Sequence, residues 1–130
     1  MCHVSALVID TSSWISYFAG KGSGLIEIAL EEATVYLPPV VAAELLSSSM
    51  SSKDRLALED LLTQLPLCGT ERAHWFRVGM LRASLGAGGV SVSTPDAHVA
   101  QCALDLEAEL LTEDRVFERI ARRCPLRLVR

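Results

Sequence analysis

The chain has 130 residues, of which half are hydrophobic and only 5% are aromatic. This size and composition predict a single domain over residues 1–130 with an aliphatic core. The formal charge of −4 excludes a broadly basic nucleic-acid-binding surface, but a few acids gathered around a cation would leave the remaining surface near neutral.

Strand-like and helix-like segments alternate along the chain, and turn or capping residues separate them. In chain order we predict a strand at 5–10, helices at 12–19 and 25–32, a strand at 34–37, a helix carrying Glu44, helices at 53–64, 71–85 and from Thr94, a strand at 109–112, a helix at 113–122 and a strand at 126–129. Strands separated by helices favour a parallel sheet with helices on both faces. We therefore predict an α/β fold.

Four acids lie where the local pattern points them towards the protein: Asp10, Glu44, Asp96 and Asp114. Asp10 and Asp114 each follow a short apolar strand, at the edge where parallel sheets bind ligands. Glu44 and Asp96 lie on apolar faces of their predicted helices. Isolated buried carboxylates are costly, whereas several are tolerated around one divalent cation, and oxygen ligands suit Mg²⁺ or Mn²⁺. The sequence therefore predicts an acidic metal site.

Each acid also has a structural interpretation. Asp96 is a first-turn acid that the helix dipole would favour, and Asp114 is a candidate helix cap. Glu44 would then pair with an arginine, whereas Asp10 has little structural purpose at the end of a buried strand. The C-terminal arginines predict either a solvated face or a strip that contacts phosphates; they are Arg115, Arg119, Arg122, Arg123, Arg127 and Arg130.

The cysteines and histidines show no ligand spacing. The four cysteines form no CxxC pair, which argues against a zinc site and favours reduced thiols in the cytoplasm; they are Cys2, Cys68, Cys102 and Cys124. We interpret His3, His74 and His98 as surface or partly buried helix residues. The N-terminus lacks a basic stretch, and no segment approaches the length of a membrane span, so we expect no membrane association.

Four segments in order along the chain resemble the motifs of PIN-domain nucleases. They are Ile9–Ser12, Pro38–Leu45, Thr94–Ala100 and Leu111–Phe117. The resemblance covers nearly the whole chain, and in size the chain looks most like the VapC toxins of prokaryotic toxin–antitoxin pairs.

The resemblance implies a three-layer α/β/α fold, Mg²⁺- or Mn²⁺-dependent endoribonuclease activity, a homodimer and inhibition by a VapB-like antitoxin. Carried over by motif, Asp10, Glu44, Asp96 and Asp114 are the catalytic and metal-binding residues, and Asp10 and Asp96 are the principal metal ligands. Ser12 or Thr112 would help to orient these ligands. The chain departs from the pattern at Glu107-Ala108, where relatives often have glycine before the strand.

Two further functions remain open at this point: a non-catalytic PIN-like interaction domain, and an RNA-processing nuclease outside a toxin–antitoxin pair. A receiver domain is excluded because it needs a lysine near its last strand, and the only lysines are Lys21 and Lys53. The aromatic residues Trp14, Tyr17 and Phe18, with the hinge at 47–52, predict an apolar groove for an amphipathic antitoxin helix.

Overall fold

Four short parallel strands form the central sheet of the protein, for which a computed structural model describes residues 5–22 and 24–129. The strands are β1 (Leu7–Ile9), β2 (Val35–Tyr36), β3 (Glu109–Leu111) and β4 (Arg127–Leu128), in the order β2-β1-β3-β4. Leu7 is in register with Val35 on one side and Glu109 on the other, and Glu109 is in register with Arg127. The predicted parallel sheet is confirmed.

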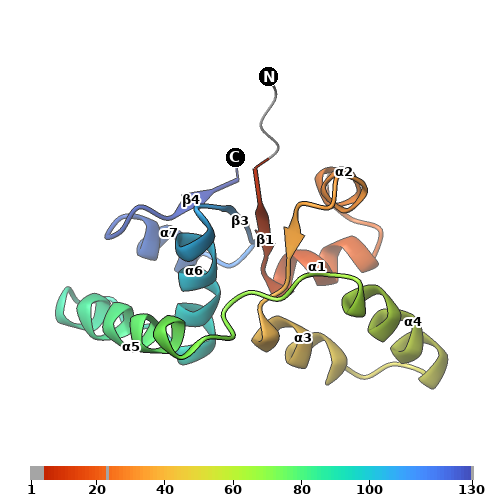
Figure 1. The fold of residues 1–130 in the computed structure, drawn as a ribbon, viewed down its shortest axis with the longest axis horizontal. Coiled ribbons are helices and arrows are strands. Elements are labelled where there is room, and N and C mark those ends of the chain that lie inside the picture. Colours follow the sequence, from red (N-terminus) through yellow and green to blue (C-terminus); the bar gives the residue numbers. More distant parts are fainter. Residues whose placement is uncertain (1–4, 23, 130) are drawn as a thin grey trace.

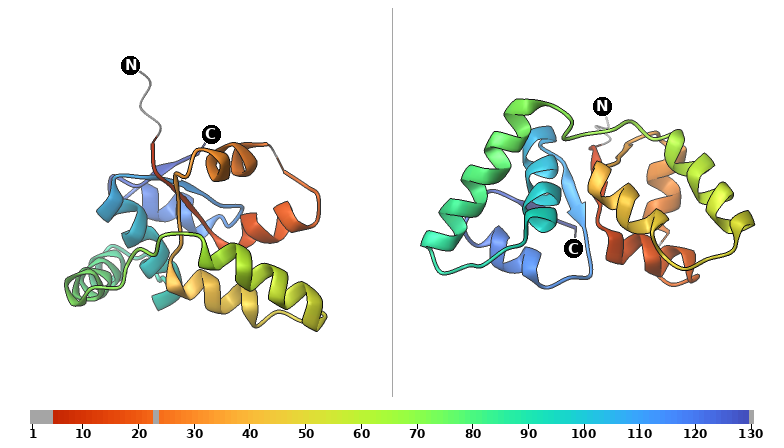
Figure 2. Two further views of the ribbon diagram at one scale, coloured as in Figure 1. Left: turned by 45° about the vertical axis from the view of Figure 1, so that its right-hand side comes forward. Right: turned by 90° about the horizontal axis from the view of Figure 1, so that it is seen from below.

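Helices lie on both sides of this sheet. They are α1 (Thr11–Phe18), α2 (Leu25–Glu31), α3 (Pro39–Leu46), α4 (Ser52–Thr63), α5 (Arg72–Ala87), α6 (Thr94–Leu106) and α7 (Val116–Ala121). Helices α5, α6 and α7 lie together on one side of the molecule and α1 to α4 on the other, with the strands between them (Figures 1 and 2). In the part of the chain that the structure describes, no helix is both long and apolar enough to cross a bilayer.

Helix α6 is the centre of the packing. It contacts β1 and β3 of the sheet and also α3, α5 and α7. Every residue from Ala97 to Ala103 is buried, which is the pattern of a helix covered on all sides. Small side chains such as Ala97, Ala100 and Ala103 allow the neighbouring elements to approach closely, and Val8, Ile9 and Leu110 of the sheet complete the apolar core.

Two helices bury most of the face that their apolar pattern predicts, but each exposes one residue of it. In α2, Ile26 and Ala29 are buried and Ile28 is exposed, whereas the sequence pattern places Ile28 inside. In α5 the buried stripe begins at His74 and not at Trp75. Short apolar runs do not fix which face meets the core, because the packing of neighbouring helices decides it.

Helix boundaries also differ from the prediction at both ends of the α5–α6 connection. Helix α5 continues through Gly86 and Ala87, where the sequence predicts a loop. The N-cap of α6 is Ser93, whose Oγ accepts a hydrogen bond from the Asp96 amide at 3.2 Å. Thr94, the predicted cap, is the first helical residue. Either hydroxyl residue suits a cap, so sequence alone does not separate them.

Glu107 ends α6 in the left-handed conformation, with φ 51° and ψ 37°. Residues with a Cβ atom rarely adopt this conformation, and glycine is the usual choice at a helix C-terminus. The departure at Glu107-Ala108 therefore coincides with a position at which the backbone favours glycine.

Glu107→Gly is expected to raise the free energy of unfolding by about 0.5–1 kcal/mol, because it removes the steric cost of the left-handed backbone. Urea denaturation monitored by circular dichroism measures the change. Glu59→Gly, at an exposed interior position of α4, is the matched control and should destabilise by about 1 kcal/mol. A destabilised Glu107→Gly variant would contradict the prediction.

Candidate functional site

Asp10 is the most buried of the four predicted acids and is held by two hydroxyl groups. It follows β1, and its side chain is 6% exposed. Although Asp10 occupies the N-cap position of α1, its side chain makes no capping hydrogen bond. Its Oδ2 accepts hydrogen bonds from Ser12 Oγ at 3.1 Å and Thr112 Oγ1 at 3.0 Å. The carboxylate is therefore directed to the sheet edge and not to its own helix.

The same two hydroxyl groups fix the turn that follows β3. Ser12 Oγ accepts from the Glu113 amide, and Thr112 Oγ1 accepts from the Asp114 amide, each at 3.0 Å. Each hydroxyl thus donates to Asp10 and accepts from the neighbouring turn. This network links the carboxyl ends of β1 and β3.

Glu44 and Asp114 are exposed, in contrast to the prediction that all four acids point inward. Glu44, on α3, accepts a hydrogen bond from Thr11 Oγ1 at 2.7 Å. Asp114 Oδ1 accepts from the Val116 amide at 3.0 Å, so Asp114 also has the structural role at the start of α7 that its sequence position allows. Exposure differs from the prediction because both acids lie at the rim of the sheet edge.

Asp96 is half-buried in the first turn of α6 and interacts electrostatically with the three other acids. Burial raises the pKa of Asp96, the Ser93 hydroxyl lowers it, and the charges of Asp114, Asp10 and Glu44 raise it further, with a net increase. The three other acids thus lie near enough to Asp96 for their charges to act on it, and we call these four residues the acid cluster.

Among the described residues, no cationic side chain forms an ion pair with the acid cluster. Within residues 5–22 and 24–129, the ion pairs join Asp105 to His74 and Arg77, and none includes a member of the cluster. A carboxylate whose pKa is raised by neighbouring carboxylates is tolerated when a divalent cation balances the charges. The oxygen-only donor set matches hard cations such as Mg²⁺ and Mn²⁺.

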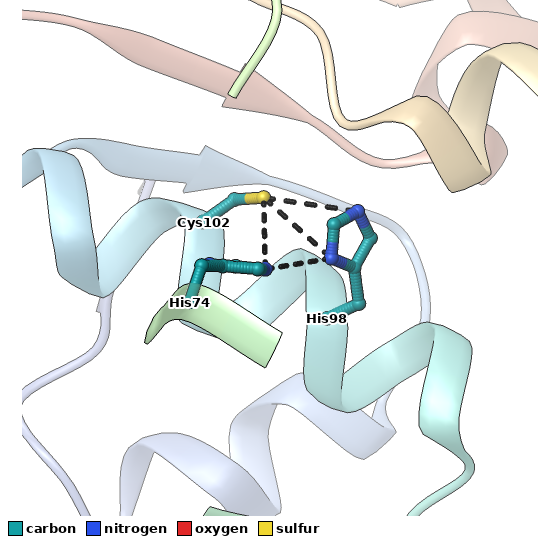
Figure 3. A group of neighbouring side chains, drawn as sticks. All are labelled: His74, His98 and Cys102. Atoms are coloured by element: carbon teal, nitrogen blue, oxygen red, sulfur yellow. Dashed lines mark hydrogen bonds between the residues drawn. The ribbon is translucent and has the colours of Figure 1, made fainter. Parts of the chain in front are cut away.

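A second group of polar side chains lies in the interior, where the sequence indicates none. His74 on α5 and His98 and Cys102 on α6 are all buried, and their ligand atoms lie within 4.8 Å of one another (Figure 3). Our interpretation of His74 and His98 as surface or partly buried residues is therefore wrong, and His3 lies outside the described residues. The one sequence feature that could have indicated this group is the spacing of His98 and Cys102, which lie one helical turn apart on the same face.

Burial sets the charge of His98, and Asp105 contacts His74. Burial and the nearby His74 lower the pKa of His98 to about 4. Burial alone would raise the pKa of Asp105, but hydrogen bonds from Arg77, His74 and Gln101 outweigh it and lower that pKa to about 2. At neutral pH, His98 is therefore uncharged and Asp105 is ionised.

An apolar groove lies between α1 and α4. It has a volume of about 550 Å³ and is lined by Phe18, Met50, Asp54, Ala57, Leu58 and Leu61. Phe18 is 47% exposed, as a groove residue should be, whereas Trp14 is 1% exposed. Trp14 therefore belongs to the core, and only part of the predicted aromatic set lines the groove.

Comparison with known proteins places the chain in a family. The PIN domain family matches residues 7–123. A VapC ribonuclease of Mycobacterium bovis and the ribonuclease VapC11 of Mycobacterium tuberculosis are each 32% identical over 123 residues, covering 89% of this chain and 92% of the relative.

Solved structures share the fold over almost the full length. DNA-bound VapBC from Salmonella typhimurium superimposes with a TM-score of 0.79 at 22% identity, covering 97% of this chain and 98% of that one. VapBC2 from Rickettsia felis, bound to a promoter DNA fragment, gives 0.76 at 21% identity, covering 95% and 97%. The structures share the fold, and the family match and the sequence relatives show that the chain belongs to the PIN-domain family and, within it, to the VapC ribonucleases.

Proposed function

We propose that this protein is a Mg²⁺- or Mn²⁺-dependent endoribonuclease that hydrolyses RNA phosphodiester bonds as the toxin of a VapBC-type pair. The observation that carries the proposal is the acid cluster: Asp96, whose pKa is raised by the charges of Asp114, Asp10 and Glu44, with none of the four in an ion pair to a cation of the described chain. Asp114 also accepts from the Val116 amide at the start of α7, but Asp10 makes no capping hydrogen bond with its side chain. The family of the chain supports the same reaction.

We assign Asp10 and Asp96 as the principal ligands of the cation, with Asp114 and Glu44 completing the acidic environment. Asp10 is held through Oδ2 by Ser12 and Thr112, which leaves Oδ1 as the oxygen we assign to the ion. Asp114 uses Oδ1 for the Val116 amide, so its other oxygen is the candidate donor. When bound, the cation would offset charge on the phosphoryl oxygens and make water more acidic.

The protein's own groups supply the remaining steps. Glu44 accepts from Thr11 through Oε1, so Oε2 is the atom that would take a proton from the attacking water. The water oxygen bonds to phosphorus as the bond to the departing ribose oxygen breaks, and that oxygen gains a proton from solvent. We assign Arg115, exposed next to Asp114, to the contact with a neighbouring phosphate.

Asp10→Asn should reduce cleavage of single-stranded or looped RNA by at least about 100-fold, because it removes a charge needed for the transition state. Gel assays with purified protein in Mg²⁺, Mn²⁺ and chelator measure this effect. Asp54→Asn, a first-turn acid on α4, should cleave like the wild type. Wild-type cleavage by Asp10→Asn would assign the activity to another site or a contaminant, and an inactive wild type would favour an interaction domain.

Asp96→Asn should raise the free energy of unfolding in chelator at neutral pH by about 0.5–2 kcal/mol, the usual gain when a functional compromise is relieved. The raised pKa of Asp96 means that the folded state binds the proton more tightly. Wild-type stability is therefore lost as pH rises from 3.8 through the folded pKa, and asparagine removes that component.

Thermal melts in chelator and in Mn²⁺ measure both this gain and the stabilisation by the cation, which should shrink in Asp96→Asn. Asp54→Asn is the matched control: Ser51 accepts from the Asp54 amide at 3.1 Å as Ser93 does from Asp96, but Asp54 is not a member of the acid cluster. It should be neutral or slightly destabilising. Loss of apo stability in Asp96→Asn, with the Mn²⁺ increment unchanged, would return Asp96 to a capping role.

We infer that the groove between α1 and α4 receives an amphipathic helix of a VapB-like antitoxin. The groove is apolar at Phe18, Leu58 and Leu61, and a helix lying there would present its hydrophobic face to it. An arginine of such a partner would form charge-assisted hydrogen bonds with the acid cluster and compete with the cation.

A second copy of the chain is the partner we propose for the exposed apolar side chains of α5. Trp75, Phe76 and Met80 are 37%, 65% and 63% exposed, and burying them would favour a homodimer. We infer a cytoplasmic location, where thiols such as Cys68, Cys102 and Cys124, which form no disulfide with one another, would remain reduced.

Ala57→Glu should weaken antitoxin binding at least about 10-fold, because it places a charge in the apolar groove. The partner to use is a VapB-like antitoxin, sought among the small reading frames next to this gene, and isothermal titration calorimetry measures the affinity. Thr63→Glu, at an exposed position of α4 that does not line the groove, is the control and should bind normally. Unchanged affinity in Ala57→Glu would place the antitoxin on another surface.

A further inference from the structure

The three buried side chains His74, His98 and Cys102, which we call the His–Cys cluster, join α5 to α6. His74 Nε2 lies 2.8 Å from His98 Nδ1. Cys102 Sγ lies 4.0 Å from His74 Nε2 and 3.9 Å from His98 Nε2. Figure 3 shows the three side chains turned towards one another from the two helices. The exposed fraction of each residue is 2% or less.

His74 is oriented by a carboxylate on its other side. Its Nδ1 lies 2.8 Å from Asp105 Oδ2, and because an ionised carboxylate only accepts hydrogen bonds, Nδ1 carries the proton and Nε2 offers a lone pair to the cluster. Asp105 is held by both Arg77 and Gln101, with hydrogen bonds of 2.8–2.9 Å. Carboxylates in this position fix the tautomer of metal-binding histidines.

The distances in the cluster are near those of a tetrahedral metal site. Zn–N bonds of about 2.05 Å and Zn–S bonds of about 2.3 Å put two nitrogens about 3.3 Å apart and nitrogen and sulfur about 3.6 Å apart. The observed separations of 2.8 and 3.9–4.0 Å lie on either side of these values. Movements of about half an ångström, small for side chains, would bring the three donors to coordination distance.

Gly69 closes the cluster on the side of the α4–α5 connection. A Cβ atom at this position would lie 2.7 Å from Cys102 Sγ and 2.8 Å from His74 Nε2, and the backbone has φ +67°. Only glycine can therefore bring the chain this close to the donors without filling the space beside them. The neighbouring residue, Cys68, is buried, and its thiol forms a hydrogen bond with that of Cys102.

We propose that His74, His98 and Cys102 bind one Zn²⁺ ion, with the Cys68 thiolate or a water as the fourth ligand. Imidazole and thiolate donors select zinc and similar transition metals over Mg²⁺. The site is separate from the acid cluster, which offers only oxygen, and the proposal does not depend on the ribonuclease function.

Metal binding would replace the hydrogen bond between His74 and His98. Without an ion, His98 Nδ1 donates to the lone pair on His74 Nε2, and the sulfur of Cys102 remains at 3.9–4.0 Å from the ring nitrogens. Upon binding, the Cys102 thiol releases its proton to solvent and the sulfur bonds to the ion, while His98 shifts its ring proton from Nδ1 to Nε2 if Nδ1 coordinates. The ion would fix α5 on α6, whose first turn carries Asp96.

Co²⁺ titration of chelator-treated protein tests the proposal, because Co²⁺ occupies tetrahedral zinc sites and absorbs light. We expect one equivalent to produce thiolate-to-cobalt charge-transfer absorption, which one equivalent of Zn²⁺ abolishes and a roughly 100-fold excess of Mg²⁺ does not, because thiolate and imidazole donors disfavour Mg²⁺. Trp75 stacks on His98 with ring centroids 4.4 Å apart, so its fluorescence should be quenched during the same titration.

Matched variants assign the absorption to these donors. Cys102→Ser and His74→Gln should lose Co²⁺ affinity at least about 100-fold, and Asp105→Asn about 10-fold, as expected for loss of a supporting carboxylate. Cys124→Ser should bind like the wild type. Absence of the charge-transfer absorption in the wild type, or its persistence in Cys102→Ser, would overturn the proposal. The wild-type spectrum decides between binding and no binding even where a variant does not fold.

Discussion

The parallel pairing of β1 with β3 is the constraint on which the acid cluster depends. Asp10 continues this pairing by donating its amide hydrogen to the Leu111 carbonyl at 2.9 Å, so the turns after both strands emerge side by side. Only then do Ser12 and Thr112 both reach Asp10 Oδ2. A shift of one residue in the register would turn these side chains to the opposite face of the sheet.

Helix α6 carries an oxygen donor in its half-exposed first turn and nitrogen and sulfur donors on the buried turns that follow. Asp96 lies in its half-exposed first turn, where the acid cluster is open to solvent. His98 and Cys102 follow on buried turns, which α5 and the Gly69 segment approach closely. The exposed end of α6 suits a hydrated hard cation and a charged substrate. The interior, from which water is excluded, suits a metal ion that prefers nitrogen and sulfur donors.

The sequence predicted those features of the site that depend only on residues close together in the chain. Asp10 and the hydroxyl residue Ser12 follow a buried strand, and parallel topology alone brings them to the edge where ligands bind. The exposure of Glu44 and Asp114 was not predictable, because it depends on how far α3 and the turn after β3 extend beyond that edge. The cap at Ser93 was missed because Thr94 offers the same chemistry one residue later.

The His–Cys cluster shows where such reasoning ends. His98 and Cys102 share a helical face, but their third partner lies 24 residues from His98 in sequence, on a helix whose buried stripe begins at His74. Sequence spacing within α6 indicates a pair, and a pair is compatible with core packing. The packing of α5 on α6 supplies the second imidazole, and Asp105 selects the tautomer that directs its lone pair inward. The sequence thus shows which residues carry nitrogen and sulfur donors, whereas the packing of the helices brings those donors together.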